Sequence, residues 1–158
     1  MIESLHEALA GHEVLTGQPE GAVELVAQCA RWATFETGQF LLREGEVADT
    51  LHLVFSGRVV IEVHQPGGES LSIETVGPGH MVGLSWVSPP YRWHFDARAL
   101  EPVTTAAIDS ECLRTQLEQD PAIGFAILDR LASTLVERLQ ATRVRLLDLH
   151  GLGDDRRR

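Results

Sequence analysis

The side chains best suited to binding a small molecule are concentrated between positions 86 and 95. In a chain that is only 6% aromatic, this stretch contains Trp86, Tyr91, Arg92, Trp93, His94 and Phe95. Aromatic faces bury large areas against flat ligands, while guanidinium and imidazole groups anchor polar atoms. The stretch therefore predicts a pocket for a flat or weakly charged ligand, with Arg92 and His94 as polar anchors. The alternative is a structural interaction module whose pocket is plugged by the indole of Trp86.

Patterns typical of enzymes and metal sites are absent from the sequence. Metal-binding jelly rolls need a His-x-His pair, whereas His52 and His64 lie twelve positions apart. The sequence has neither a Gly-x-Ser-x-Gly nucleophile elbow nor a phosphate-binding P-loop. His80, His94 and Cys112 are candidate haem ligands, but no Cys-x-x-Cys-His motif accompanies them. We therefore predict a protein that is not an enzyme and has no metal site.

The charge balance argues against nucleic acid as a partner. The chain carries 13 basic and 23 acidic residues, for a formal net charge of −10. Because neutralising phosphates supplies most non-specific nucleic-acid affinity, this acidic surface predicts no DNA binding. The one basic run, Arg156–Arg158, lies at the end of the chain, where a frayed terminus is the simpler interpretation.

Cysteine usage and hydropathy bear on the compartment. Cys29 and Cys112 fall inside helical patterns, and no signal peptide precedes them. We therefore expect a cytoplasmic chain with reduced thiols rather than a disulfide. No apolar stretch approaches the roughly 20 residues needed to cross a bilayer, so no membrane association is expected.

Short strands are the elements that must position the aromatic stretch. Gly-containing turns separate β-prone runs at position 35 and at 40–42, 51–55, 59–63 and 71–76. Two further strands are expected around 94–100 and 104–108. Strands this short with turns this frequent are typical of a compact barrel or sandwich. Ahead of them, residues 1–20 predict a short helix and a loose lead-in, and apolar positions within 21–33 predict a short amphipathic helix.

Helical patterns return after Asp109. Ser110 is the predicted N-cap of a first helix, on which Leu113 and Leu117 share a face. Asp120-Pro121 then predicts a new helix, because Asp is a good N-cap and Pro fits the first helical position. Nothing interrupts this second helix before Leu149, which gives it a length of about 43 Å.

This last helix carries an apolar seam. At spacings of three and four it presents Phe125, Leu128, Ala132, Leu135, Leu139, Thr142, Leu146 and Leu149. Such a seam is typical of coiled coils and predicts a homodimer through the C-terminal helix; the alternative is packing within its own domain. A second stripe, Ile123, Ile127, Leu131 and Thr134, is expected to cover the β domain. The second half of the helix, around Arg138 and Arg145, is expected to lack such cover.

The stretch from Phe35 to Val59 resembles the opening strands of cyclic-nucleotide-binding domains. These domains occur in CRP/FNR-type catabolite-activator regulators, in kinase regulatory subunits and in gated channels. Gly38, Gly45 and Gly57 stand where that β-roll turns sharply, at positions that need a positive φ. The resemblance extends over roughly 21–149 and implies a stand-alone domain without the helix-turn-helix domain of the DNA-binding members.

The family binds its ligand through a phosphate-binding cassette. Its usual form is Gly-Glu followed by Arg-Ser/Thr-Ala-x-Val-Arg-Ala, in which the Glu accepts from the ribose 2′-OH and the Arg holds the cyclic phosphate. Matching Gly83 to the glycine, and 97–99 to the trailing Val-Arg-Ala, puts Leu84 in place of the Glu and Trp93 in place of the Arg. The resemblance makes Arg98 a structural strand residue. The candidate ligand-binding residues are Gly83, Leu84, Ser85, Trp86, Arg92, Trp93, His94 and Phe95.

These expectations define one fold and three functions. The fold is mainly β with flanking helices: a β-roll (a jelly-roll-like barrel) at 21–120, a dimerisation helix at 121–150 and a tail at 151–158. The first function is a non-enzymatic sensor with a degenerate cassette that acts on an unidentified protein partner. The second is a genuine cyclic-nucleotide receptor that uses Arg92, and the third is the plugged module. No cofactor is certain, with a cyclic nucleotide or another small ligand as the candidates.

Overall fold

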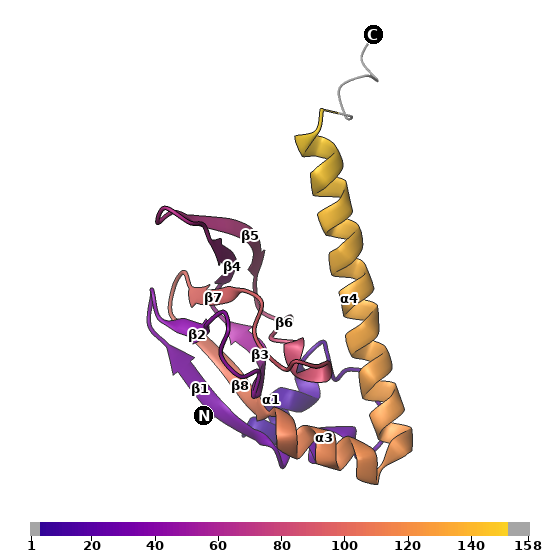
Figure 1. Ribbon diagram of the computed structural model, residues 1–158. Coiled ribbons are helices and arrows are strands. Elements are labelled where there is room, and N and C mark those ends of the chain that lie inside the picture. The colour runs from indigo at the N-terminus through magenta and orange to yellow at the C-terminus, as the bar shows by residue number, and fades with distance from the viewer. Residues whose placement is uncertain (1–3, 152–158) are drawn as a thin grey trace.

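A computed structural model describes residues 4–151 of the chain. Eight strands form two four-stranded sheets with antiparallel pairing throughout (Figure 1). The first sheet has the order β1 (Ala30–Phe35), β8 (Val103–Asp109), β3 (Thr50–Ser56) and β6 (Met81–Val82). The second has the order β2 (Phe40–Leu42), β7 (Asp96–Ala99), β4 (Val59–His64) and β5 (Ser70–Val76). The predicted β-roll is confirmed; beyond Gly151 the predicted tail lies outside the described residues.

Tight turns between strands depend on glycine. Gly38, Gly45 and Gly57 have φ of 88°, 85° and 82°, as expected from the resemblance. At Gly57, between β3 and β4, a Cβ atom would also lie 2.2 Å from the carbonyl oxygen of Pro102. Both the left-handed backbone and the close approach therefore exclude a side chain at this turn.

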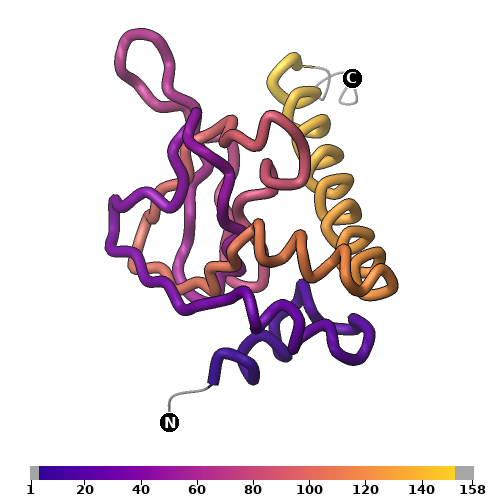
Figure 2. The backbone as a smooth tube through the Cα atoms, turned by 60° about the horizontal axis from the view of Figure 1, so that its bottom comes forward, coloured from indigo at the N-terminus to yellow at the C-terminus, as the bar shows by residue number. Residues whose placement is uncertain are grey.

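Two short helices precede the strands. They are α1 (Leu5–Gly11) and α2 (Ala22–Ala27), which lie together at one end of the sheets (Figure 2). A capping box between Ser4 and Glu7 starts α1. The predicted helix over 21–33 is wrong in its second half, because residues from Ala30 onward pair with β8 as strand β1. Pairing with a neighbouring strand overrides the helical spacing of the alanines there.

Two helices follow the last strand. The first, α3 (Ser110–Gln119), is capped by Asp109, whose side chain accepts from the Cys112 N–H, so the predicted cap at Ser110 is wrong by one residue. Leu113 and Leu117, which were predicted to share a face, are both buried. The second, α4 (Pro121–Leu149), begins as predicted, with the Asp120 side chain accepting from the Ile123 N–H.

Cys29 and Cys112 form a disulfide, and the prediction of reduced thiols is wrong. Cys29 lies in the turn after α2 rather than in a helix, and its Cα atom is 5.6 Å from that of Cys112 in the first turn of α3. The strand register explains the proximity: Ala30 pairs with Ile108, and the Asp109 N–H donates to the Cys29 carbonyl. The bridge joins segments separated by 83 positions.

The two halves of α4 have different surroundings. Ile123, Ile127 and Leu131 are buried, which confirms that the first half covers the β domain. The second half runs alongside the sheets (Figures 1 and 2), where Arg138 and Arg145 donate to the carbonyls of Met81 and Ile73. The expectation that this half lacks contact with the β domain is therefore wrong on one side of the helix. Between residues 4 and 151, no helix is long and apolar enough to cross a membrane.

Candidate functional site

A pocket of about 570 Å³ lies between the second sheet, the segment from Val82 to Ala97 and the second half of α4. Its volume is within the range that holds drug-sized ligands. Six of the eight predicted ligand-binding residues line it: Gly83, Leu84, Ser85, Trp93, His94 and Phe95. The sequence therefore located most of one wall of this pocket.

Trp86 is not one of the residues that line the pocket. It lies in the 3₁₀ turn η1 (Ser85–Val87), is only 2% exposed, and its carbonyl accepts from the Arg114 guanidinium on α3. The same guanidinium lies over the Tyr91 ring, 4.7 Å from its centroid. The expectation that the Trp86 indole plugs the pocket is wrong, because Trp86 is not among the lining residues and the Arg114 guanidinium of α3 lies over its ring, 5.9 Å from the centroid.

Arg92 also lies outside the pocket lining. Its side chain is exposed and donates to the Gly45 carbonyl at 3.3 Å, and its backbone forms an isolated β-bridge with Val47. This conformation turns the guanidinium toward the β2–β3 connection. It does not favour the alternative in which Arg92 replaces the phosphate-binding arginine.

The Trp93 ring packs so closely against Gly83 that a side chain at position 83 would not fit. Gly83 has a φ of 96°, and a Cβ atom there would lie 2.9 Å from Cη2 of the indole. Backbone bonds fix the tryptophan from the other side, since its N–H donates to Glu46 and its carbonyl accepts from Gly45. Trp93 is therefore held as a buried apolar wall at the position where the family resemblance places an arginine.

The fourth helix supplies a pocket wall that sequence reasoning did not find. Leu135, Arg138, Leu139 and Thr142 all line the pocket. Three of them belong to the predicted dimer seam, and their spacing gave no sign of a second role. The Arg138 Nε atom lies 3.9 Å from a carboxylate oxygen of Glu74, which also lines the pocket.

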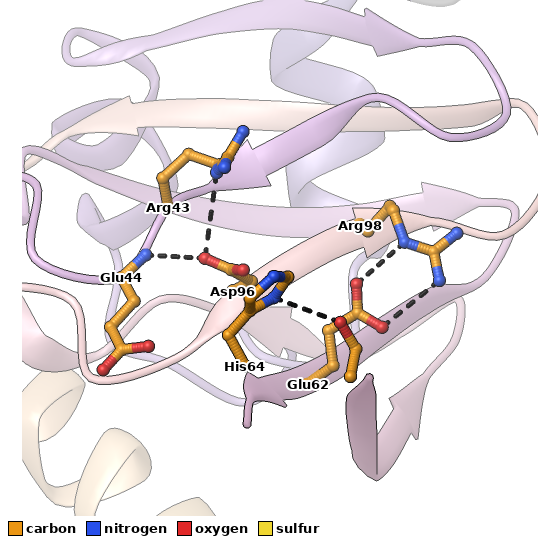
Figure 3. A network of polar contacts seen from close by, with 7 residues as sticks. Arg43, Glu44, Glu62, His64, Asp96 and Arg98 are labelled. Carbon is orange, nitrogen blue, oxygen red and sulfur yellow. Dashed lines mark hydrogen bonds and ion pairs between the residues drawn. The ribbon is translucent and has the colours of Figure 1, made fainter. Parts of the chain in front are cut away.

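Polar contacts join β7 to β4 and to the segment that follows β2 (Figure 3). Asp96 is buried and accepts from the Glu44 N–H at 2.7 Å, with Arg43 Nε 3.8 Å away. Arg98 donates two hydrogen bonds, of 2.8 and 3.2 Å, to the buried carboxylate of Glu62. These hydrogen bonds raise the pKa of the Arg98 guanidinium above its ordinary value. The expected structural role of Arg98 is confirmed.

Replacing Arg98 by methionine is expected to lower the free energy of unfolding by about 2 kcal/mol, measured by urea titration. The loss arises because the Glu62 carboxylate would remain buried without its partner. The double variant Arg98→Met/Glu62→Leu should recover at least half of the loss, since it removes the uncompensated charge as well. A single variant as stable as the wild type would contradict this role.

Few of the candidate haem ligands remain available. Cys112 is bonded to Cys29, and His80 does not line the pocket, whereas His94 does. Over the range 4–151, no three His, Cys, Asp or Glu side chains are grouped as a metal site would require. The pocket is therefore described by its apolar walls and by the few polar groups among them.

The chain matches a known family of protein domains. The model for the cyclic nucleotide-binding domain matches residues 32–120. A "CRP-like cAMP-activated global transcriptional regulator" of Mycobacterium tuberculosis is 26% identical over 145 residues, which cover 92% of this chain. The chain spans 63% of that relative's length.

Solved structures share the architecture. A candidate cyclic nucleotide-binding protein of Geobacter metallireducens superposes with a TM-score of 0.75 at 25% identity, over 87% of this chain and 99% of its own. The N-terminal domain of a Streptomyces coelicolor transcriptional regulator gives 0.66 at 25% identity, over 84% and 93%. The Thermus thermophilus catabolite activator protein, at 22% identity, gives 0.69 over 87% and 63% and shows the fold alone.

Proposed function

We infer that this chain, which belongs to the cyclic nucleotide-binding domain family, is a non-enzymatic sensor with a degenerate cassette. The family is regulatory, and the pocket is the natural place for its ligand. One observation carries the proposal: Leu84 and the buried Trp93 line the pocket where the family resemblance places the ribose-binding Glu and the phosphate-binding Arg. Small ligands other than the usual cyclic nucleotides are therefore the candidates for this pocket.

Cyclic AMP is expected to bind no tighter than about 0.1 mM, measured by calorimetry. Losing one partner of a buried charge pair costs about 2–5 kcal/mol, which moves a micromolar site toward the millimolar range. The variant Leu84→Glu/Trp93→Arg should bind cyclic AMP more tightly, because both contacts return together. Cyclic GMP serves as the second ligand in each titration.

Two results would contradict this proposal. Low-micromolar binding by the wild type, abolished by Arg92→Ala, would favour a genuine receptor that uses Arg92 through a shifted loop. Low-micromolar binding that survives Arg92→Ala would show that a different group holds the phosphate. Arg58→Ala is the matched control in each case, since Arg58 pairs with Glu101 on the exposed surface and does not line the pocket.

The apolar residues on α4 support a homodimer. Several seam positions are substantially exposed in the single chain: Leu128, Leu135, Leu139, Leu146 and Leu149. A helix with such a stripe is stabilised by a partner helix, and we propose that this partner is a second copy. The net charge of −10 favours a protein rather than DNA as the regulated partner. A cytoplasmic location remains a prediction. The redox state of Cys29 and Cys112 in cells tests it, because a reducing compartment disfavours a disulfide.

A further inference from the structure

We propose that the pocket selects an uncharged, largely apolar aromatic molecule and discriminates against anionic analogues of the same shape. This inference rests on the proposed sensor function and names the ligand class for that site. It depends on which charged side chains line the pocket, and the cassette positions alone do not determine this.

The cationic side chain on α4 that faces the pocket is already compensated. Arg138 donates to the Met81 carbonyl, and its Nε atom lies 3.9 Å from the Glu74 carboxylate. Both side chains are mostly buried, 26% and 22% exposed, so water screens their interaction only partly. An anionic ligand would have to displace Glu74 from Arg138 before it gained a charge partner.

The other carboxylate in the wall opposes an anion directly. Asp96 lines the pocket with its side chain only 7% exposed, held by the Glu44 N–H. Arg43 lies 3.8 Å from it but does not line the pocket, so it offsets part of the charge of Asp96 without being available to a ligand. Among the groups that line the pocket, an incoming anion would therefore meet the carboxylates of Asp96 and Glu74 against the guanidinium of Arg138 and the imidazole of His94.

The remaining walls suit a flat apolar molecule. Aliphatic side chains of the second sheet and of α4 face the space, among them Ile61, Ile73, Leu135 and Leu139. Trp93 and Phe95 add aromatic faces, which favour offset or edge-on contact with another ring. The hydroxyl of Ser85 can orient such a ligand by hydrogen bonds without a charge on it, and that of Thr142, which donates to the Arg138 carbonyl, can accept one.

A matched pair of fluorescent probes tests this selectivity. N-phenyl-1-naphthylamine is uncharged, and 1-anilinonaphthalene-8-sulfonate is the same ring system with one sulfonate added. Fluorescence titration of the wild-type protein should show saturable binding of the neutral probe at least tenfold tighter than that of the sulfonate. Equal affinity, tighter sulfonate binding or no binding of the neutral probe would each overturn the proposal.

Two substitutions localise the binding and test its cause. Ile73→Trp, on β5 and outside the seam, should project into the pocket and weaken binding of the neutral probe at least tenfold, whereas Ser72→Trp, on an exposed face of the same strand, should not. Glu74→Gln should release Arg138 and narrow the preference for the neutral probe about tenfold. An unchanged preference in Glu74→Gln, or equal effects of the two tryptophans, would refute the proposal. Low-micromolar cyclic AMP binding would instead refute the sensor function on which it rests.

Discussion

Replacing Leu128 and Leu146 together by glutamate is expected to convert the protein from dimers to monomers. Both residues lie in the predicted seam, are 41% and 50% exposed in the single chain, and do not line the pocket. Two glutamates per helix would place four like charges in one apolar contact, which should weaken association at least 100-fold. Light scattering at tens of micromolar should fall from twice the chain mass to 17.4 kDa.

The matched control adds the same two charges elsewhere on the helix. Ser133 and Val144 are exposed and lie roughly opposite Leu128 and Leu146 at 3.6 residues per turn. The variant Ser133→Glu/Val144→Glu should therefore remain dimeric, with unchanged helix content. A wild type that is already monomeric at tens of micromolar would refute the dimer. Leu135 and Leu139 are unsuitable for this test because they also line the pocket.

Reducing the Cys29–Cys112 disulfide is expected to lower the melting temperature by about 10 °C. A bridge across 83 positions restricts the unfolded chain strongly, and losing it should cost about 3–5 kcal/mol. Calorimetry with and without reductant measures the shift. The bridge ties the turn before β1 to α3, so the first sheet and the base of α4 should loosen together.

The control for this prediction is the double variant Cys29→Ser/Cys112→Ser. It should melt near the temperature of the reduced wild type and should not respond to reductant. A thiol assay on the denatured, unreduced protein should detect no free thiol before reduction and two afterward. Two free thiols in the untreated protein, or a melting temperature that ignores reductant, would show that the bridge does not contribute to stability.

The sequence predicted those parts of the fold that local chemistry controls. Turn positions such as Gly57 have a backbone conformation that residues other than glycine rarely adopt, so their glycines mark the ends of the strands in the sequence. The Asp120-Pro121 start of α4 is likewise a local signal. At 30–33 local spacing failed, because helical and strand patterns coincide there and pairing with β8 decided between them.

The site was predictable in position but not in detail. Gly83 and Trp93 could be matched to positions of the family cassette from the sequence. The orientation of the Trp86 side chain could not, because it depends on Arg114, which lies on a different element. The disulfide could not be foreseen, since it follows from the register of β1 on β8. The place of Arg138 in the pocket wall was not predicted, because its contact with Glu74 joins α4 to β5, two elements far apart in the sequence.

Leu135 and Leu139 face two neighbours at once, the pocket and the predicted partner helix. In a single chain each is nearly half exposed, at 45% and 48%, so the partner helix of the proposed dimer would complete this wall. Ligand binding and dimerisation would then be thermodynamically coupled, so that each would change the equilibrium constant of the other by the same factor. Ligand affinity would therefore depend on the protein concentration, and dilution alone would change it.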